Sequence, residues 1–458
     1  MMNTIIGLEQ HVQLKTNAKL FCECPTEGYL EAEPNTLVCP VCVSHPGSKP
    51  YGVNEEAVRN AVKISLALGC KVVTEKPILV QRKHYFYPDL PSNYQRTSKP
   101  IAKDGMLSGV RIREVHLEED PGRYDLRTGK VDYNRSGIPL VEIITEPDIK
   151  SPEHARKFLD ELQAIMNYLN VAREEAGSTR IDANVSIGGH NRVEVKNINS
   201  FKGVLTALTY EAMRQKNLIK NNIEIIQETR HFDEGQGTTI GLRLKETAAD
   251  YRYFPDPDVP PITISEKKVK EIKKEIPELP AEKAKRFVRD YTVSETDAFV
   301  ITQEKEFADG FEKIAHKIQP RLAARFMRGV LKKQLNYRGL KLSNSGLNEK
   351  KIIELLELVE KKRITPKVAE KLLVLMLDEQ KPLKKLPLYE ELVGIEKEGI
   401  VEEAVEKVLK EYEKAVKDFK KGEEKALHFL IGKVMHLTKG KAHPEIIHKH
   451  LKKRLKAG

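Results

Sequence analysis

A proline-rich run, FPDPDVPP at residues 254–261, divides this chain into two parts whose sequence patterns differ. Neither a helix nor a strand continues readily through it, because proline lacks a backbone N–H and fixes its own φ. Before the run, short β-branched segments recur between turns, whereas from about Val293 apolar residues recur at helical spacing. The pattern predicts an α+β domain over residues 1–292, a helical domain over 293–400 and a Lys-rich helical tail over 401–458.

Several segments of the first part have the composition and alternation of strands. They are Thr4–Leu14, Val110–Glu118, Val131–Tyr133, Pro139–Thr145, Arg180–Ile187, Arg192–Ile198 and Thr239–Leu244. Two helices interrupt them. One begins after Ser151, a residue type that caps helices, with Pro152 at the first helical position. The other spans about Phe201–Lys216.

Four of the five cysteines lie close together in the sequence. They are Cys22, Cys24, Cys39 and Cys42. The spacing C-x-C-x14-C-x2-C supplies two thiolate pairs separated by a loop, as a tetrahedral zinc site needs. Four thiolates leave no open position for chemistry, so we expect a structural zinc within segment 20–45. The alternative, four buried free cysteines, is unusual in so turn-rich a segment. We expect the fifth cysteine, Cys70, to lie in the hydrophobic core.

Charged residues also stand where strands should bury side chains. Because side chains alternate along a strand, Glu9 and His11 share one face of the first predicted strand. Glu118 and Glu119 are adjacent, so on a regular strand they point to opposite faces, and only one can join a given metal unless the strand ends there. Glu142 lies inside the apolar run PLVEII, where an unpaired carboxylate would be costly.

The run RIDANVSIGGHNRVEVKNIN predicts a hairpin with one apolar and one polar face. The polar face carries Arg180, Asp182, Asn184, Ser186, Glu194 and Lys196. For a single hairpin, an ordinary solvent face with ion pairs is the commoner interpretation. Several acidic strand faces with Lys and Arg nearby are, however, what Mg²⁺ and a triphosphate need. The sequence lacks a G-x4-G-K-[ST] phosphate loop, a G-x-S-x-G elbow and an H-E-x-x-H motif, so we expect any ATP to bind on a sheet.

The chain has a formal net charge of +11 and a pI near 9.1, which favours an acidic partner such as nucleic acid. Residues 427–458 hold 8 Lys and Arg, five His and a single acid, Glu445. A solvated terminal helix and a basic arm for a phosphate backbone both fit that pattern. We recognise neither a secretory signal nor an apolar run of ~18 residues that would span a membrane, so we expect a cytoplasmic protein with no membrane partner.

Longer runs resemble those of one known family. They are IGLEQHVQLKT, EPNTLVCPVC, HPGSKP, RKHYFYPDLPSNYQ, HLEEDPG, VDYNRSGIPLVEIITEPDIKSPEHA, RIDANVSI, VEVKNINSF, QETRHFDE, DYRYFPDPDVPP and KALHFLIGKVMHLTKGKAHPEIIHKHLKKRL. In this order they are similar to the B subunits of the aspartyl/glutamyl-tRNA amidotransferases. The archaeal E subunit of a second tRNA amidotransferase shares the opening and the cysteines. It carries a large insertion for which this chain lacks room, and RKHYFYPDLP favours the B subunit.

The resemblance implies a cradle-like catalytic domain related to glutamine synthetase, then a helical domain and a small helical tail that binds tRNA. It implies that ATP phosphorylates the side-chain carboxylate of Asp or Glu mischarged on tRNA(Asn) or tRNA(Gln), and that ammonia displaces the phosphate. A glutaminase A subunit would supply the ammonia, and a small C subunit would complete a heterotrimer. ATP, Mg²⁺ and Zn²⁺ are the implied cofactors.

The resemblance also implies roles for residues at matching positions. The expected Mg²⁺-binding set is Glu9, His11 and Glu119, with Glu118, Glu142, Asp182 and Glu194 as further acidic candidates. The residues expected to face phosphates are Lys83, Arg180, Lys196, Arg243 and Arg252. Of these, Lys83, Lys196 and Arg243 join Glu9, His11 and Glu119 in the expected catalytic set. The sequence departs from the family pattern at Gln10, which lies on the opposite strand face and should not affect catalysis, and at His84.

Other classes of function stay open from the residues alone. A non-catalytic tRNA-binding scaffold accounts for the basic tail but not for the acidic strand faces. A metal-dependent hydrolase accounts for the carboxylates but not for the cysteines or the tail. The sequence also leaves open whether Asp-tRNA(Asn), Glu-tRNA(Gln) or both are substrates.

Overall fold

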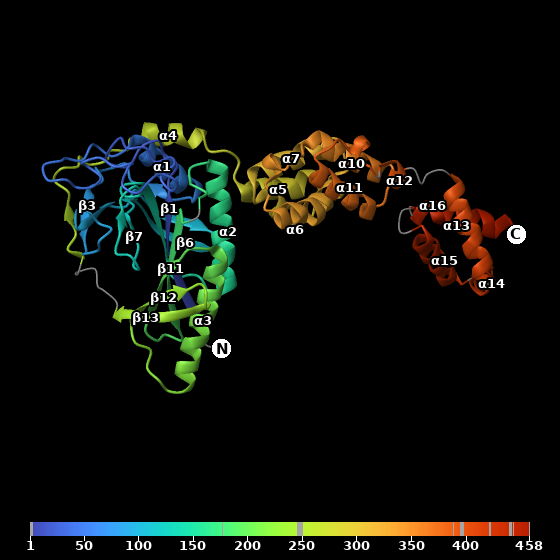
Figure 1. Cartoon of the computed structure of the whole chain (residues 1–458). Coiled ribbons are helices and arrows are strands. Elements are labelled where there is room, and N and C mark those ends of the chain that lie inside the picture. The colour runs from blue at the N-terminus through green and yellow to red at the C-terminus, as the bar shows by residue number, and fades with distance from the viewer. Residues whose placement is uncertain are drawn as a thin grey trace. The chain divides into compact units, whose positions relative to one another are not determined.

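The computed structural model describes residues 3–175, 177–244, 251–387, 389–393, 398–420, 423–438, 442 and 444–457, without the side chains of residues 243, 244, 391, 398–400, 456 and 457. It divides into two compact units, Met1–Leu279 and Pro280–Gly458 (Figure 1). Within the described ranges, no helix is both long and apolar enough to cross a membrane.

One large mixed sheet forms the frame of the first unit. Its main path runs β13-β12-β11-β10-β1-β9-β6-β4-β3-β14, with β2 and β5 branching from β6. The strands are β1 (Thr4–Gln13), β2 (Lys71–Val72), β3 (Val80–His84), β4 (Tyr94–Ser98), β5 (Ala102–Leu107), β6 (Val110–Glu119), β9 (Pro139–Thr145), β10 (Thr179–Ile187), β11 (Val193–Ile198), β12 (Glu228–Asp233), β13 (Thr238–Leu244) and β14 (Phe254–Pro255). The short strands β7 (Arg123–Tyr124) and β8 (Val131–Asp132) pair separately.

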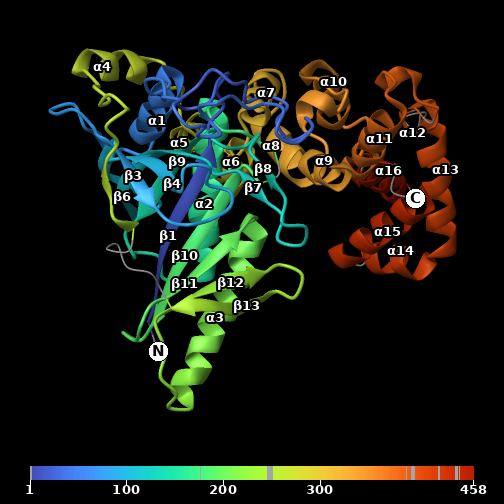
Figure 2. The ribbon, with the colours of Figure 1, turned by 60° about the vertical axis from the view of Figure 1, so that its left-hand side comes forward.

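One face of this sheet is apolar and packs against helices. Alternate residues of its strands, such as Leu8, Val141 and Val185, are almost fully buried in a single core. The helices α1 (Glu55–Ala67), α2 (Pro152–Leu169) and α3 (Phe201–Lys220) contribute apolar side chains to that core. Figures 1 and 2 show α2 and α3 running along the sheet, and α4 (Glu266–Lys274) near α1. The packing leaves the other face of the sheet free to carry polar groups.

The α+β character of the first part and the helical second part are confirmed. All the predicted strands are present within a residue or two of the expected bounds, although β8 belongs to the small separate sheet. Ser151 caps α2, because its hydroxyl accepts a hydrogen bond from the His154 N–H at 3.1 Å. The helix predicted from Phe201 ends at Lys220. The strands β3, β4, β5 and β12 and the two-residue strands β2, β7 and β14 were not predicted. Of these, β14 forms at the start of the proline-rich run, where it pairs with the edge of β3.

The second unit is helical and contains two hydrophobic cores, one between Phe287 and Val393 and one between Val401 and Leu455. The helices around the first core are α5 (Pro280–Tyr291), α6 (Glu295–Thr302), α7 (Lys305–Ala315), α8 (Pro320–Phe326), α9 (Lys332–Arg338), α10 (Glu349–Glu360), α11 (Pro366–Glu379) and α12 (Tyr389–Val393), with a π-helical turn at Met327–Leu331. Those around the second are α13 (Glu398–Glu411), α14 (Glu413–Lys420), α15 (Glu424–Leu437) and α16 (Pro444–Ala457). Because Phe287 of α5 is fully buried in the first of these cores, the units divide before α5 rather than at residue 292.

Candidate functional site

The face of the sheet turned away from the core is polar, because the strand register brings charged side chains of neighbouring strands to the same side. His11 of β1 stands opposite Glu142 of β9 and Arg180 of β10, and Glu9 stands opposite Asp182. We call this side the polar face. Its charged and amide residues include Glu9, His11, Lys83, Gln95, Glu118, Glu142, Arg180, Asp182, Glu194 and Lys196.

At the middle of the polar face, His11, Glu118 and Glu142 form a compact cluster from three adjacent strands. His11 Nε2 lies 3.6 Å from Glu118 Oε2 and 3.5 Å from Glu142 Oε1. One ligand atom from each residue lies within 4.8 Å of the others. Both carboxylates are buried, so their charges must be balanced by nearby cations. The cluster therefore has the residue types and spacing of a cation site.

The pKa values reflect how strongly these groups interact. Burial opposes a charged His11, but the hydrogen bond and charge of Glu142 raise the His11 pKa overall. Burial likewise disfavours ionised Glu142, yet His11 and the charge of Lys83 lower the Glu142 pKa. The Lys83 pKa is raised well above its usual value, because Glu118 and Glu142 outweigh the effect of burial. Glu142 thus keeps its negative charge, and the two carboxylates hold Lys83 protonated.

A second acidic group continues the polar face along β10 and β11. Burial and then the charge of Glu142 raise the pKa of Glu9, and Asp182 and Glu194 raise it further. Lys196 Nζ lies 3.6 Å from Asp182 Oδ2 and 3.9 Å from Glu194 Oε1. Although burial opposes it, these two carboxylates raise the Lys196 pKa. The carboxylates outnumber the cations here, which favours binding of an added cation.

The polar face also contains groups that the sequence analysis did not assign to the site. Gln95 on the unpredicted strand β4 donates to Glu118 Oε2 at 3.3 Å. Asp120, which directly follows Glu118 and Glu119 in the sequence, accepts hydrogen bonds from Gln13 at 2.6 Å and from Arg180 at 2.8 Å. The acidic run HLEED could have indicated Asp120 as a residue of the site. No sequence pattern indicated Gln95, because its strand was not predicted.

Glu119 is not part of the cluster around His11. Its carboxylate accepts a hydrogen bond from the Arg96 backbone N–H at 2.9 Å and lies 3.4 Å from Arg96 Nη1. Arg96 Nε also donates to Asp256 at 2.9 Å, and Arg82 pairs with the same carboxylate. Since side chains alternate along β6, Glu118 joins the polar face and Glu119 joins this ion-pair network on the opposite side.

The remaining predicted phosphate-binding residues lie at the ends of the sheet. Arg243 stands opposite Thr229 in the register of β13 and β12, but its side chain lies outside the described residues. Arg252 is exposed, and its backbone oxygen lies 3.3 Å from His84 Nδ1. Neither is brought next to the His11 cluster by the described contacts.

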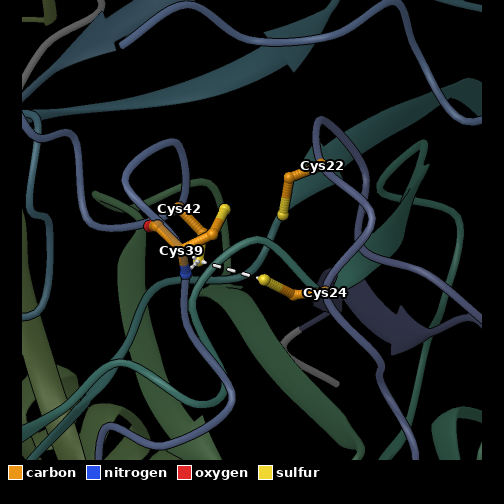
Figure 3. Close-up of side chains that lie close together, drawn as sticks. All are labelled: Cys22, Cys24, Cys39 and Cys42. Carbon is orange, nitrogen blue, oxygen red and sulfur yellow. Dashed lines mark hydrogen bonds between the residues drawn. The ribbon is translucent and has the colours of Figure 1, made fainter.

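The four predicted zinc ligands converge, as Figure 3 shows. Their Sγ atoms all lie within 4.8 Å of one another, and the Cys24 and Cys42 sulfurs are 3.9 Å apart. A tetrahedral zinc with bonds of about 2.3 Å would place its sulfurs about 3.8 Å apart. A hydrogen bond from Cys22 and the charge of Lys19 help lower the Cys42 pKa to about 5, despite burial. Cys70 is buried in the hydrophobic core, as expected.

Comparison with known proteins identifies the family. Residues 4–270 match the model of the GatB/GatE catalytic domain, and residues 309–455 match that of the GatB domain. The B subunit of the aspartyl/glutamyl-tRNA(Asn/Gln) amidotransferase of Methanothermobacter thermautotrophicus is 50% identical over 98% of this chain and 99% of the relative. The proteins of the same name from Methanobrevibacter smithii and Methanocaldococcus jannaschii are each 49% identical, over 96% and 98% of this chain and 97% of each relative.

This chain belongs to the family of amidotransferase B subunits. The resemblance drawn from the sequence runs is therefore confirmed over nearly the full length. The family consists of subunits of a carbon–nitrogen ligase, so the scaffold and hydrolase alternatives are not favoured. The E-type alternative is not favoured either, because the relatives that match over whole chains are B subunits.

Proposed function

We propose that this protein activates the side-chain carboxylate of Asp or Glu mischarged on tRNA(Asn) or tRNA(Gln). ATP transfers its γ-phosphoryl group to that carboxylate, giving an acyl phosphate and ADP. Ammonia then attacks the acyl carbon, inorganic phosphate leaves and the amide remains. The observation that carries the proposal is the polar face, where a buried carboxylate–histidine cluster lies beside Lys83 in a chain that belongs to the family of amidotransferase B subunits.

The donor set of the cluster fits a magnesium ion. Octahedral Mg²⁺ with bonds of about 2.1 Å separates neighbouring ligands by about 3.0 Å and opposite ones by about 4.2 Å. The 3.5 and 3.6 Å separations around His11 Nε2 are compatible with such a shell. Glu118 and Glu142 supply the oxygens that Mg²⁺ prefers, and His11 supplies a nitrogen that it accepts less readily. When bound, Mg²⁺ would offset the charge of the phosphates.

The cations of the polar face would position the triphosphate. Lys83 stands beside Glu118 and Glu142, and Lys196 beside Asp182 and Glu194, so each cation adjoins a candidate metal ligand. Phosphoryl transfer depends mainly on positioning and charge neutralisation, for which such neighbours are suited. Arg180, held by Asp120 at 2.8 Å, is a third candidate. Arg243 and Arg252 are further candidates from the sheet ends.

Glu9 is a candidate for a further metal contact rather than a member of the three-residue cluster. Asn184 Nδ2 donates to Glu9 Oε1 at 3.2 Å, and the Glu9 pKa is raised by burial and by its acidic neighbours. A bound cation would relieve that repulsion. Glu119 is a weaker candidate, because its carboxylate is engaged by Arg96.

The other proposed features concern assembly. The spacing of the four sulfurs supports a structural Zn²⁺, and we interpret the polar-faced sheet as a cradle related to that of glutamine synthetase. A glutaminase A subunit would supply ammonia, and a small C subunit would complete the complex. The second unit would bind tRNA through the basic tail. We expect the reaction to take place in the cytoplasm, which is compatible with a tRNA substrate of this kind.

ATP turnover in the reconstituted complex tests the proposal. With ammonium as nitrogen donor, ADP release should require mischarged Asp-tRNA(Asn) or Glu-tRNA(Gln) and should equal the amide formed. Correctly charged tRNA serves as the control and should leave ADP release at background. Amide formation without ATP, or ADP release independent of mischarged tRNA, would refute the proposal.

A further inference from the structure

We infer that Lys19 is a positioning residue for the metal at the cysteine cluster, balancing thiolate charge and fastening the cluster to the segment that leads into β9. This inference rests on the zinc site proposed above. Lys19 lies between Thr16 and Cys22 and was not singled out by the sequence analysis.

The burial of Lys19 is the first observation. Its side chain is only 1% exposed and is among the largest fully buried side chains of the described residues. Lysine is rarely buried to this extent unless its charge is balanced, because transfer of an ammonium from water is costly. A balancing group is therefore expected close to its Nζ atom.

The contacts of Nζ identify that group. Nζ donates to the Leu37 backbone oxygen at 2.9 Å and to the Tyr133 backbone oxygen at 3.3 Å. Its third acceptor is Cys42 Sγ at 3.6 Å. The two carbonyls are neutral, so of these three acceptors only the sulfur can carry a negative charge, as the thiolate that zinc binding requires. The buried positive charge of Lys19 and the negative charge of a thiolate cluster therefore balance each other.

The charge of a loaded site favours the same pairing. Zn²⁺ with four thiolates has a net charge of −2, and a buried anion of that size needs compensation. One ammonium in contact with a ligand sulfur reduces the local charge to −1. Hydrogen bonds to ligand atoms also fix their orientation, and loss of such a contact typically weakens metal binding by about 10–100-fold.

The same contacts connect the cysteine cluster to the catalytic sheet. Lys19 bridges Leu37 of the cysteine loop and Tyr133 of the segment before β9. Ser136 Oγ in that segment donates to the Cys42 backbone oxygen at 3.1 Å. The chain then enters β9, which carries Glu142 of the polar face. Lys19 thus joins the metal loop to the strand that positions one of the candidate magnesium ligands.

Zinc release from the full-length chain tests the inference, with Lys19→Met as the main variant. The zinc content of the wild-type protein is measured first, and absence of zinc there would overturn the zinc site itself. With zinc present, Lys19→Met should lower zinc affinity in competition with a chelator by about 10–100-fold. Zinc affinity within about twofold of wild type would overturn the role of Lys19 while leaving the zinc site standing.

Two further variants separate this role from general destabilisation. Lys283 is another buried lysine, 6% exposed, which lies in the second unit and pairs with Glu312 at 3.0 Å. Lys283→Met should destabilise the protein but leave zinc affinity unchanged. An equal loss of zinc in both variants would overturn the inference.

Lys19→Gln keeps a donor for the carbonyl oxygens but lacks the charge, and it should lose zinc as Lys19→Met does. If Lys19→Met does not fold, Lys19→Gln carries the test, and wild-type zinc affinity in that variant would refute the charge argument.

A thermodynamic cycle of protein stability gives an independent readout. Because Lys19 is proposed to act through the metal site, its replacement should cost less stability in a Cys39→Ser/Cys42→Ser background. An undiminished cost there would contradict the inference.

Discussion

The His11 cluster, which contains Glu118 and Glu142, and the Arg96 network, which contains Glu119, lie on opposite sides of the sheet. This arrangement leads to a paired prediction. We compare Glu142→Gln, which removes a carboxylate from the His11 cluster, with Glu119→Gln, which removes one from the Arg96 network. Both substitutions preserve shape and remove one negative charge, from the buried Glu142 or from the half-buried Glu119. They differ in the face of the sheet that is changed. If the polar face performs phosphoryl transfer, only Glu142→Gln should stop the reaction.

The structure sets the magnitude of each effect. Glu142 Oε1 lies 3.5 Å from His11 Nε2, a separation at which unit charges attract by about 5 kcal/mol at an effective dielectric constant of 20. Loss of a well-placed electrostatic group at a catalytic site commonly removes about 3–4 kcal/mol of transition-state stabilisation. Since 1.36 kcal/mol corresponds to a tenfold change, we expect kcat to fall by about 10²–10³-fold in Glu142→Gln.

Glu119→Gln should affect folding more than catalysis. The new amide oxygen still accepts from the Arg96 N–H, and Arg96 keeps its 2.9 Å bond to Asp256. Loss of the charged hydrogen bond should lower the free energy of unfolding by about 1.5–3 kcal/mol. We expect kcat to change by less than about tenfold, a limit set by 1.36 kcal/mol.

Single-turnover amidation with saturating tRNA, ATP and ammonium measures both variants. Free ammonium separates loss of activation from loss of ammonia supply, and urea denaturation measures stability. The reasoning is refuted if Glu142→Gln retains near-normal turnover while Glu119→Gln abolishes it. That result would return the metal site to the set Glu9, His11 and Glu119 implied by the sequence.

Three further results are expected. The Cys39→Ser/Cys42→Ser protein should contain no zinc by elemental analysis and should have a lower Tm, and a normal zinc content would contradict the site. Replacement of the exposed Lys449, Lys452 and Lys453 by Ala should weaken tRNA binding and reduce its salt dependence, by ~0.9 in the log–log slope per lost phosphate contact on duplex. An unchanged slope would show that these lysines do not contact phosphate. Hydrogen bonds from Arg111 lower the Asp148 pKa to about 2, from the usual 3.8, so this pair stabilises the fold fully above pH 4 and loses its effect as the pH falls toward 2. The stability difference between wild type and Asp148→Asn should therefore narrow on acidification, and a difference independent of pH in urea titrations would disprove this linkage.

The central part of the polar face was predictable because period-two alternation is a local property. The positions of Glu9, His11, Asp182 and Glu194 on shared strand faces follow directly from their spacing. The register that joins His11 to Glu142 and Arg180 depends on pairing between strands far apart in the sequence. Alternation within one strand cannot specify that pairing, so the composition of the three-residue cluster required the structure.

The strands that the sequence did not predict explain why the other contacts of the site required the structure. The run VQRKH of β3 is dominated by polar and basic residues, and YQRTS of β4 has no apolar alternation. Both strands lie near one end of the sheet, where Lys83 faces the polar side and Arg96 faces the opposite side. Without β4, the partner of Glu119 could not be found from the sequence. The parity of Glu118 and Glu119 was nevertheless sufficient to predict that their side chains point to opposite sides of β6.

Transfer of an oxygen atom tests the central claim most directly. We would supply the complete complex with Asp-tRNA(Asn) or Glu-tRNA(Gln) labelled with ¹⁸O in the side-chain carboxylate, together with ATP and ammonium. Activation through an acyl phosphate breaks the bond between the acyl carbon and the bridging oxygen, so one labelled oxygen should appear in inorganic phosphate for each amide formed. Amide formation with unlabelled phosphate would contradict activation of that carboxylate by ATP.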